Sequence, residues 1–237
     1  MPITFKEIIP GPIRGLFMLV LNVHSDHRGR TRPCYNRDEF TLSCLPSFGG
    51  TGTTDTVTMS DSYQGVVRAY HVLKNKRYDP DTGKAYGGSK LIRVEQGSAF
   101  IDLLDVREDG PTFGWHVTTV LDRFDLAIIV PGGVGNGFQA LSDIMTYHYM
   151  MESSWRPGLE GEISYKEGRW PISITDPERQ LSVVRDLKAR TFEEIYGGTP
   201  AYECFLKGLE ASGSSNGPFI KWEPRVPPFA VNLPRNP

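Results

Sequence analysis

The sequence predicts a mainly β protein with the strand pattern of a sandwich or jelly roll. Two observations support this prediction: short β-branched and aromatic runs recur at regular intervals, and Gly, Pro and Asp separate them. Even spacing of short strands is typical of such two-sheet folds. The predicted runs are 90–94, 97–105, 116–120, 126–130, 137–140 and 147–151. A length of 237 residues suffices for one large β domain with additions.

The N-terminal part predicts a buried strand followed by a tight turn. Leu16–Val23 scarcely alternates between polar and apolar residues, which indicates a strand buried on both faces. In the turn that follows, Asp26 can cap its own backbone and Gly29 can adopt a positive φ. Arg28 then has two interpretations: a surface ion pair with Asp26, or an anion-binding side chain.

The stretch Gly65–His71 is the strand around which the sequence is organised. A period of two places Ala69 and His71 on one face, and Arg68 and Tyr70 on the other. A histidine at a strand end is most often an ordinary core or rim residue, and in a minority of positions it is a base. Its partners elsewhere in the chain favour the second interpretation.

Three segments between strands have a distinct composition. Pro46–Thr56 is rich in Gly, Thr and Ser and predicts a mobile loop. Lys74–Gly88 carries Asp-Pro and Thr-Gly steps, which predict a hairpin excursion or a lid rather than a core strand. Val130–Phe138 has four glycines in a turn that enters a strand, so the backbone is expected to approach another group closely.

The C-terminal part differs from the rest of the chain in the elements that its residues predict. Thr191–Ile195 and Tyr202–Leu209 are compatible with helices, and the proline-rich stretch Pro218–Pro237 predicts an extended arm that packs on the domain or on a partner subunit. We therefore expect a main domain over residues 1–190 and a C-terminal helical segment with an arm over residues 191–237.

The composition argues against a nucleic-acid-binding, a membrane-spanning and a disulfide-rich protein. A net charge of −2 provides no basic surface for nucleic acid, and no apolar run approaches the roughly 20 residues of a membrane helix. The cysteines Cys34, Cys44 and Cys204 are odd in number and lack CxxC spacing, so neither a disulfide framework nor a zinc site is predicted. A reducing cytoplasm fits this pattern best.

A series of motifs then occurs in one order along the chain. They are Asp26-x-Arg28-Gly29, Ser60-x-Ser62, Gly65–His71, Lys90–Gly97, Asp105–Arg107, Pro111–Trp115, Pro131–Phe138, Leu141–Asp143, Tyr149 and Pro157. Together they resemble the dTDP-4-dehydrorhamnose 3,5-epimerase family over about residues 15 to 190. The resemblance implies a cupin-type double-sheet jelly roll, usually a homodimer. It also implies a nucleotide-linked 4-keto-6-deoxyhexose as substrate, and no metal or organic cofactor.

The chemistry of this reaction class assigns roles to four residues. A ketone at C4 acidifies the C–H bonds at C3 and C5, so inversion needs a base, a donor for the enolate and an acid on the opposite face. The resemblance implies His71 as the base, Lys90 as the enolate-facing cation and Tyr149 as the acid. Asp186 is implied as the carboxylate that orients His71, although its segment is one residue longer than the family pattern. A helix cap or a surface charge is the alternative for Asp186.

The resemblance also implies substrate-binding residues and shows departures from the pattern. Arg28 is expected at the diphosphate and Arg68 near the sugar and phosphates. Asn136 stands where the family has a second histidine, and it can donate a hydrogen bond but carry no charge. Pro33 replaces a glutamate, and Thr56–Thr58 replaces a Gln-x-Asn pair that contacts the thymine.

Three functions stay open at this point. The first is epimerisation at C3, C5 or both centres of a nucleotide-linked keto sugar. The second is a related cupin activity such as 3,4-ketoisomerisation, although the presence of both Tyr149 and Lys90 favours epimerisation. The third is a non-catalytic nucleotide-sugar binding or assembly protein. A metal cupin is a poor fit, because the five histidines do not form a His-x-His and carboxylate motif.

Overall fold

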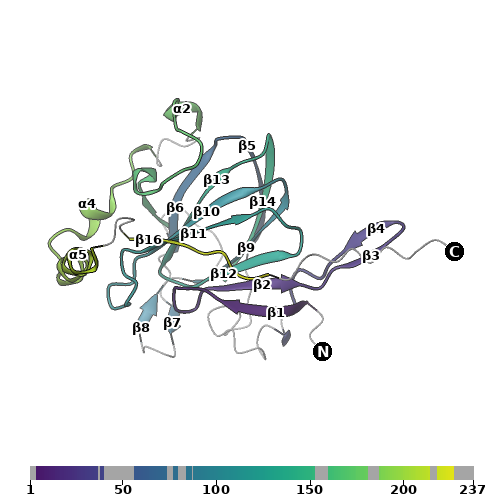
Figure 1. Ribbon diagram of the computed structural model, residues 1–237, viewed down its shortest axis with the longest axis horizontal. Coiled ribbons are helices and arrows are strands. Elements are labelled where there is room, and N and C mark those ends of the chain that lie inside the picture. The colour runs from purple at the N-terminus through teal and green to yellow at the C-terminus, as the bar shows by residue number, and fades with distance from the viewer. Residues whose placement is uncertain are drawn as a thin grey trace.

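Two six-stranded sheets pack against each other as a sandwich (Figure 1). The computed structural model describes residues 4–36, 38–39, 56–73, 77–79, 84–86, 88–152, 160–180, 187–213 and 218–226. The first sheet has the strand order β1-β2-β12-β9-β14-β5, and the second has the order β15-β6-β13-β10-β11-β16. Each sheet therefore interleaves strands from distant parts of the chain, as the predicted jelly roll requires.

The bounds of the strands follow the predicted runs closely. The first sheet contains β1 (Phe5–Pro10), β2 (Phe17–Leu21), β12 (Leu126–Val130), β9 (Lys90–Gln96), β14 (Ile144–Met151) and β5 (Thr56–Tyr63). The second contains β15 (Glu160–Ile163), β6 (Val67–Leu73), β13 (Val134–Ala140), β10 (Ala99–Asp105), β11 (His116–Leu121) and β16 (Phe219–Lys221). The mainly β prediction is confirmed.

Two hairpins and several short helices complete the fold. The hairpins are β3 (His24–Asp26) with β4 (Gly29–Thr31), and β7 (Arg77–Asp79) with β8 (Lys84–Tyr86). The helices are η1 (Tyr165–Glu167), α2 (Pro177–Gln180), α4 (Phe192–Tyr196) and α5 (Pro200–Ser212). The hairpin excursion predicted after His71 is confirmed by β7 and β8. The loop predicted over residues 46–56 lies outside the described residues except for Thr56, which begins β5.

The main core lies between the sheets and is built from alternate residues of both. It includes Val20, Ile92, Val94 and Ile128 from the first sheet, and Ile101, Leu103, Val117 and Phe138 from the second. These side chains are at most 4% exposed. Their intervening neighbours face outward, which gives each sheet a second, outer surface.

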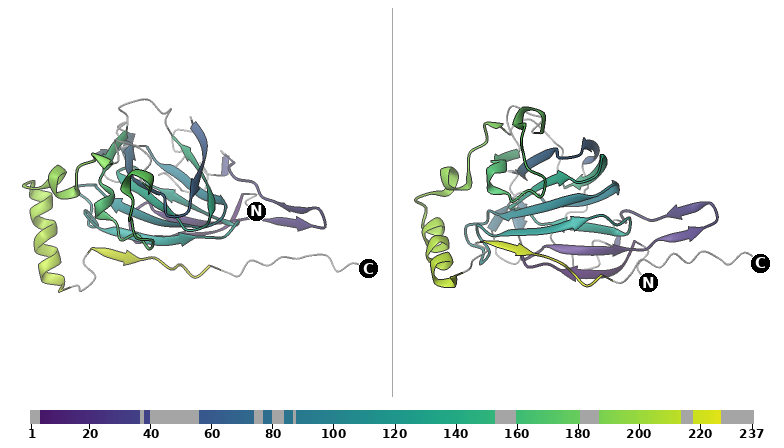
Figure 2. Two further views of the ribbon diagram at one scale, coloured as in Figure 1. Left: turned by 90° about the horizontal axis from the view of Figure 1, so that it is seen from above. Right: turned by 45° about the horizontal axis from the view of Figure 1, so that its top comes forward.

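The helical C-terminal segment packs on an aromatic cluster at one end of the second sheet, on its outer side. Phe192 of α4 packs with Phe113, and Phe205 of α5 joins the same aromatic cluster. Thr191 caps α4 in a reciprocal capping box with Glu194, which satisfies backbone donors that a helix start leaves open. Figure 2 shows α5 at one end of the sandwich and the β3–β4 hairpin projecting at the other. In the described part of the chain, no helix has the length and apolar character to cross a membrane.

Candidate active site

A β-bulge in β6 decides which side chains meet between the sheets. Arg68 pairs with Phe138 and His71 pairs with Asn136, so three residue steps on β6 oppose two on β13. Residues that oppose each other share a face of the sheet. Phe138 faces inward, because its ring stacks on Tyr147 of β14 at 4.2 Å. Arg68 and His71 therefore both face the space between the sheets.

This arrangement corrects the sequence analysis, which placed Arg68 and His71 on opposite faces. Strict alternation fails here because the extra residue of the bulge reverses the face of every residue beyond it. The Nε atom of Arg68 lies 3.3 Å from the hydroxyl oxygen of Ser62 on β5 and donates a hydrogen bond to it. Arg68 thus bridges the two sheets.

Two glycines of the glycine-rich segment, Gly135 and Gly137, lie within β13 and provide the predicted close approach. A Cβ atom added at Gly137 would lie 3.1 Å from the Tyr70 ring and 3.1 Å from Trp170. A Cβ atom at Gly135 would lie 3.1 Å from the Cβ atom of Tyr70. Distances of this size are tighter than ordinary van der Waals contacts, so the two glycines admit the Tyr70 side chain on the outer face of the sheet.

Lys90 joins the site from the opposite sheet. It begins β9, is 6% exposed, and its Nζ atom donates to the backbone carbonyl of His71 at 3.4 Å. Tyr149 lies on the neighbouring strand β14, opposite Ile92, so it is a diagonal neighbour of Lys90 on the inner face. The ammonium and the phenol therefore belong to one wall, and His71 belongs to the facing wall.

Asn136 is held by a tyrosine that the sequence analysis did not select. The hydroxyl of Tyr147 donates to the Oδ1 atom of Asn136 at 3.2 Å. Burial raises the pKa of the Tyr147 phenol, although the hydrogen bond to Asn136 opposes this, so Tyr147 stays protonated at neutral pH. Its spacing of two residues from Tyr149 on a predicted strand is the signal that could have identified it, because both then share a face.

The structure brings together five of the seven predicted site residues, namely Arg68, His71, Lys90, Asn136 and Tyr149. Arg28 lies elsewhere, on the β3–β4 hairpin that projects from the sandwich (Figure 1). Its side chain is 79% exposed and pairs with Asp26 at 2.5 Å, as the ion-pair interpretation expects. Asp186 lies outside the described residues, so its role stays a prediction.

The inner-face residues supply groups for proton transfer. An imidazole, a phenol and an ammonium from two facing walls can remove a proton, return one, and stabilise the negative charge that develops between these steps. Within the described chain, no group of three or more His, Cys, Asp or Glu side chains is placed to hold a metal ion.

Strands β9 and β14 carry a second polar cluster on their outer face. Glu95 of β9 pairs with both Arg93 and Arg32, and His148 of β14 lies 3.7 Å from the same carboxylate. Burial disfavours the charged form of Glu95, but the hydrogen bond from Arg93 and the two guanidinium charges give it a lowered pKa overall. For His148, burial and then the charge of Arg93 lower the pKa to about 4. The imidazole is therefore neutral at pH 7.

Comparisons with known proteins agree on one family. Residues 10–194 match the family described as dTDP-4-dehydrorhamnose 3,5-epimerase. The chain is 26% identical over 205 residues to a dTDP-4-dehydro-6-deoxyglucose 3-epimerase of Streptomyces bikiniensis, covering 85% of this chain and 98% of that protein. It is 27% identical over 178 residues to the dTDP-4-dehydrorhamnose 3,5-epimerase of Salmonella typhimurium, covering 73% of this chain and 88% of that protein.

Solved structures give the same result for the fold. A 3'-monoepimerase from Streptomyces bikiniensis in complex with dTDP-quinovose superposes with a TM-score of 0.66 and 25% identity. The match covers 86% of this chain and 98% of that one. Together with the family match over residues 10–194, these likenesses establish that the chain belongs to the dTDP-4-dehydrorhamnose 3,5-epimerase family.

Proposed function

We propose that this protein epimerises a nucleotide-linked 4-keto-6-deoxy sugar at C3, at C5 or at both centres. The observation that carries the proposal is the bulge of β6, which turns Arg68 and His71 toward Lys90 and Tyr149. The names of the relatives, a 3-epimerase and a 3,5-epimerase, support the reaction class. A dTDP-sugar in complex with a structural neighbour supports the substrate class.

The proposed reaction runs through an enolate. The imidazole of His71 removes the proton from the carbon beside the ketone, and the electron pair of the broken C–H bond moves to the carbonyl oxygen. The ammonium of Lys90 stabilises the negative charge on that oxygen. The electron pair then returns from the enolate oxygen to the same carbon, which takes a proton from the phenol of Tyr149 on its opposite face and is thereby inverted. To complete the cycle, the imidazolium of His71 releases its proton to solvent and the Tyr149 phenolate takes one up. Asp186 is proposed to stabilise the imidazolium.

Substrate recognition is assigned to cations and an amide. Arg68 reaches across the inner face to Ser62, and its guanidinium is proposed to bind the sugar and the phosphates. Asn136 is proposed to donate a hydrogen bond to the substrate from its amide nitrogen, while Tyr147 holds its amide oxygen. We also propose that the main domain ends at residue 190. The cysteine pattern indicates a reducing cytoplasm, which we propose as the location of the protein.

The proposal includes a homodimer in which Arg28 serves the site of a second copy. Arg28 projects on its hairpin away from the sandwich of its own chain. Edge strand β5 also exposes Val57, Met59 and Tyr63 by 58%, 60% and 74%, a surface typical of association. Mixing an Arg28→Ala chain with a His71→Asn chain should restore activity, because one of the mixed sites keeps both residues. Two inactive variants that stay inactive after mixing, although they exchange subunits, contradict this arrangement.

The first test is proton NMR of dTDP-4-keto-6-deoxyglucose incubated with the protein in deuterated water. Loss of the C3 and C5 signals indicates epimerisation at both centres, and loss of one signal indicates a single-centre enzyme. A product with the keto group moved to C3 indicates the ketoisomerase instead. Ligand binding without exchange, for this and other nucleotide sugars, indicates the non-catalytic binding protein and overturns the proposal.

The second test addresses the base. His71→Asn keeps a side chain of similar polarity but cannot accept the proton, so exchange at the active centres should be lost while the unfolding transition stays cooperative. Exchange at the wild-type rate would remove His71 from the role of base.

A further inference from the structure

We infer that Tyr70, Asp102 and His116 form a buried network that fixes the β6 bulge and so positions Arg68 and His71. The C-terminal strand β16 is part of this support. In this arrangement the three network side chains are positioning residues that touch no substrate. The catalytic consequence rests on the proposed function, whereas the effect on the bulge can be measured independently.

Tyr70 belongs to the bulge itself. It lies between Arg68 and His71 in the sequence, but its side chain points away from theirs. Its ring packs over Gly135 and Gly137 on the outer face of β13. The ring of Trp170 lies 5.8 Å from that of Tyr70 and closes the same outer-face cluster. A movement of the Tyr70 ring would therefore have to displace the backbone of β6, and with it the residues that face inward.

The hydroxyl of Tyr70 is held by a carboxylate with two partners. It donates to the Oδ2 atom of Asp102 at 2.8 Å, and the Oδ1 atom of Asp102 lies 2.9 Å from the Nδ1 atom of His116. Tyr70 and Asp102 are 0% exposed and His116 is 3% exposed. A buried polar network of this kind rigidifies its surroundings when its members are paired, because each unpaired group would be costly.

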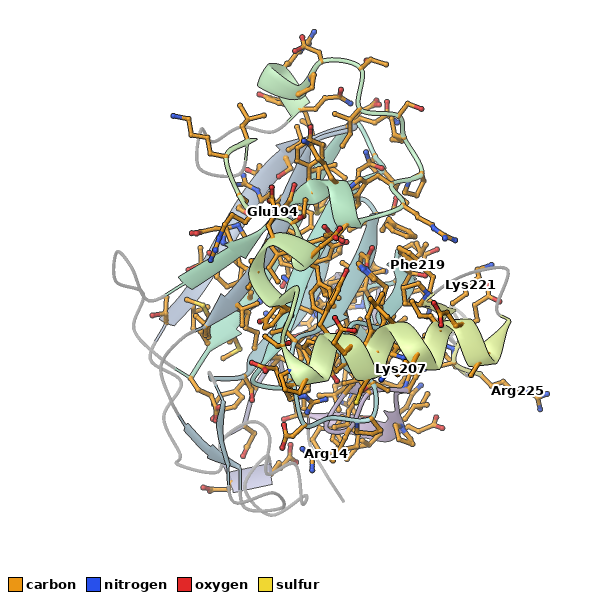
Figure 3. All side chains as sticks on the ribbon, turned by 90° about the vertical axis from the view of Figure 1, so that its left-hand side faces the viewer. Arg14, Glu194, Lys207, Phe219, Lys221 and Arg225 are labelled. Carbon is orange, nitrogen blue, oxygen red and sulfur yellow. The ribbon has the colours of Figure 1, made fainter. Side chains whose placement is uncertain are left out.

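His116 connects this network to the C-terminal strand. Its ring stacks on Phe219 of β16 with 4.3 Å between the ring centroids and 18° between the ring planes. The backbone nitrogen of His116 donates to the carbonyl of Pro218 at 2.7 Å. The guanidinium of Arg169 lies 4.1 Å from the centroid of the Phe219 ring. Figure 3 labels Phe219 and Lys221 on this strand, above α5 in that view.

The contact between Phe219 and His116 involves a part of the chain outside the family match. Residues 219–221 lie beyond the family match, which ends at residue 194, and they pair in parallel with β11. The segment that follows the family domain thus reaches the strand carrying the proposed base through three contacts: Phe219 to His116, His116 to Asp102, and Asp102 to Tyr70. We expect the bulge to loosen when any of them is removed.

The main experiment compares Tyr70→Phe, Asp102→Asn and the double variant with wild type. Tyr70→Phe removes one oxygen and keeps the ring over the two glycines. Because small displacements of a catalytic group cost up to about 10²-fold in rate, we expect kcat to fall about 10- to 100-fold while KM changes far less. The double variant should be no slower than the slower single variant, because residues that act as one unit are not additive.

The matched control is Tyr196→Phe. Tyr196 belongs to the same outer-face aromatic cluster but lies on α4, outside the network, so its variant should keep the wild-type kcat. Phe219→Leu keeps an apolar side chain and removes the stack on His116; we expect a smaller fall in kcat, about three- to tenfold. Amide hydrogen exchange of residues 68–71 should become faster in Tyr70→Phe and Phe219→Leu, and not in Tyr196→Phe.

The outcomes separate this inference from the proposed function. Wild-type kcat and wild-type amide protection in Tyr70→Phe would overturn the network. Lower stability with unchanged kcat and unchanged protection at residues 68–71 would show a merely structural role and also overturn it. If wild-type protein shows no epimerisation at all, the proposed function fails, and amide exchange alone still decides whether the network holds the bulge.

Discussion

The inner and outer faces of the β9–β14 strand pair use polar side chains in different ways. On the outer face, Glu95 is shared by two buried arginines, and His148 is driven to its neutral form. On the inner face, Lys90 bonds to a backbone carbonyl and Tyr147 bonds to an amide. Adjacent residues of the two strands thus form an ion cluster on the outer face, whereas the inner face carries the side chains that are proposed to act on the substrate.

This difference has a physical consequence. A buried cation paired with a carboxylate contributes to stability only while its partner remains, because the loss of one partner leaves an uncompensated charge. On the inner face, Lys90 and Tyr149 are the groups proposed to act on the substrate, so replacing either of them removes a step of the proposed reaction. Substitutions on the inner face should therefore change chemistry more than stability, and substitutions on the outer face should do the reverse.

The largest effect is expected for Lys90→Met on the inner face. Loss of the ammonium removes the proposed stabilisation of the enolate, and the loss of one such donor typically costs about 10²- to 10³-fold in kcat. The measurement is the rate of deuterium incorporation at the active centre. A rate within tenfold of wild type, with a folded protein, would contradict the assigned role of Lys90 and weaken the contrast between the faces.

Glu95→Gln tests the outer face. The change keeps the shape of the side chain but leaves Arg32 and Arg93 without their shared carboxylate, so we expect a loss of about 3 kcal/mol in the free energy of unfolding. Urea denaturation at pH 7 measures it. The control is Glu223→Gln, because Glu223 is 70% exposed and its pair with Lys221 should contribute less than about 1 kcal/mol. A similar loss in both variants would show that the ion pairs of Glu95 contribute no more to the free energy of unfolding than an exposed ion pair does.

His148 predicts a dependence of stability on pH. Its pKa is lowered from 6.5 to about 4 in the folded protein, so the unfolded chain binds the proton more tightly. Stability is therefore highest above pH 6.5 and falls as the pH drops toward 4. Partial hydration of the cluster reduces the effect, and we expect a loss of about 1–2 kcal/mol between pH 7 and pH 5. The slope of unfolding free energy against pH should flatten in His148→Gln; an unchanged slope would exclude His148 as its source.

The smallest effect is expected for Tyr147→Phe on the inner face. The variant loses one hydrogen bond to Asn136, which contributes about 1 kcal/mol, and keeps the ring stack on Phe138. Deuterium incorporation should slow by less than about tenfold. Tyr149→Phe, which removes the proposed acid, should be much slower. Equal losses in the two variants would show that position on the strand, rather than the role of each phenol, decides the outcome.

The sequence by itself determined the strands and the order of the motifs. The strand Leu126–Val130 has the same bounds in the prediction and in the structure, because a β-branched run between turn residues signals a buried strand locally. The tight turn in the N-terminal part of the chain was also predicted correctly, because Gly29 adopts a positive φ and the Asp26 side chain accepts a hydrogen bond from the backbone of Arg28, two residues away. The glycines indicated a close approach, but its partner, Tyr70 of β6, was decided by the tertiary structure.

Only the tertiary structure decided how these pieces meet. The β6 bulge turns Arg68 to the side of His71, and it depends on the register against β13, which no periodicity within β6 reveals. The bonds from Tyr147 to Asn136 and from Tyr70 to Asp102 likewise join residues of different strands. The position of Arg28 outside its own sandwich is also a tertiary result. Local residue types specify strands and turns, whereas register and packing between distant segments specify which side chains share a site.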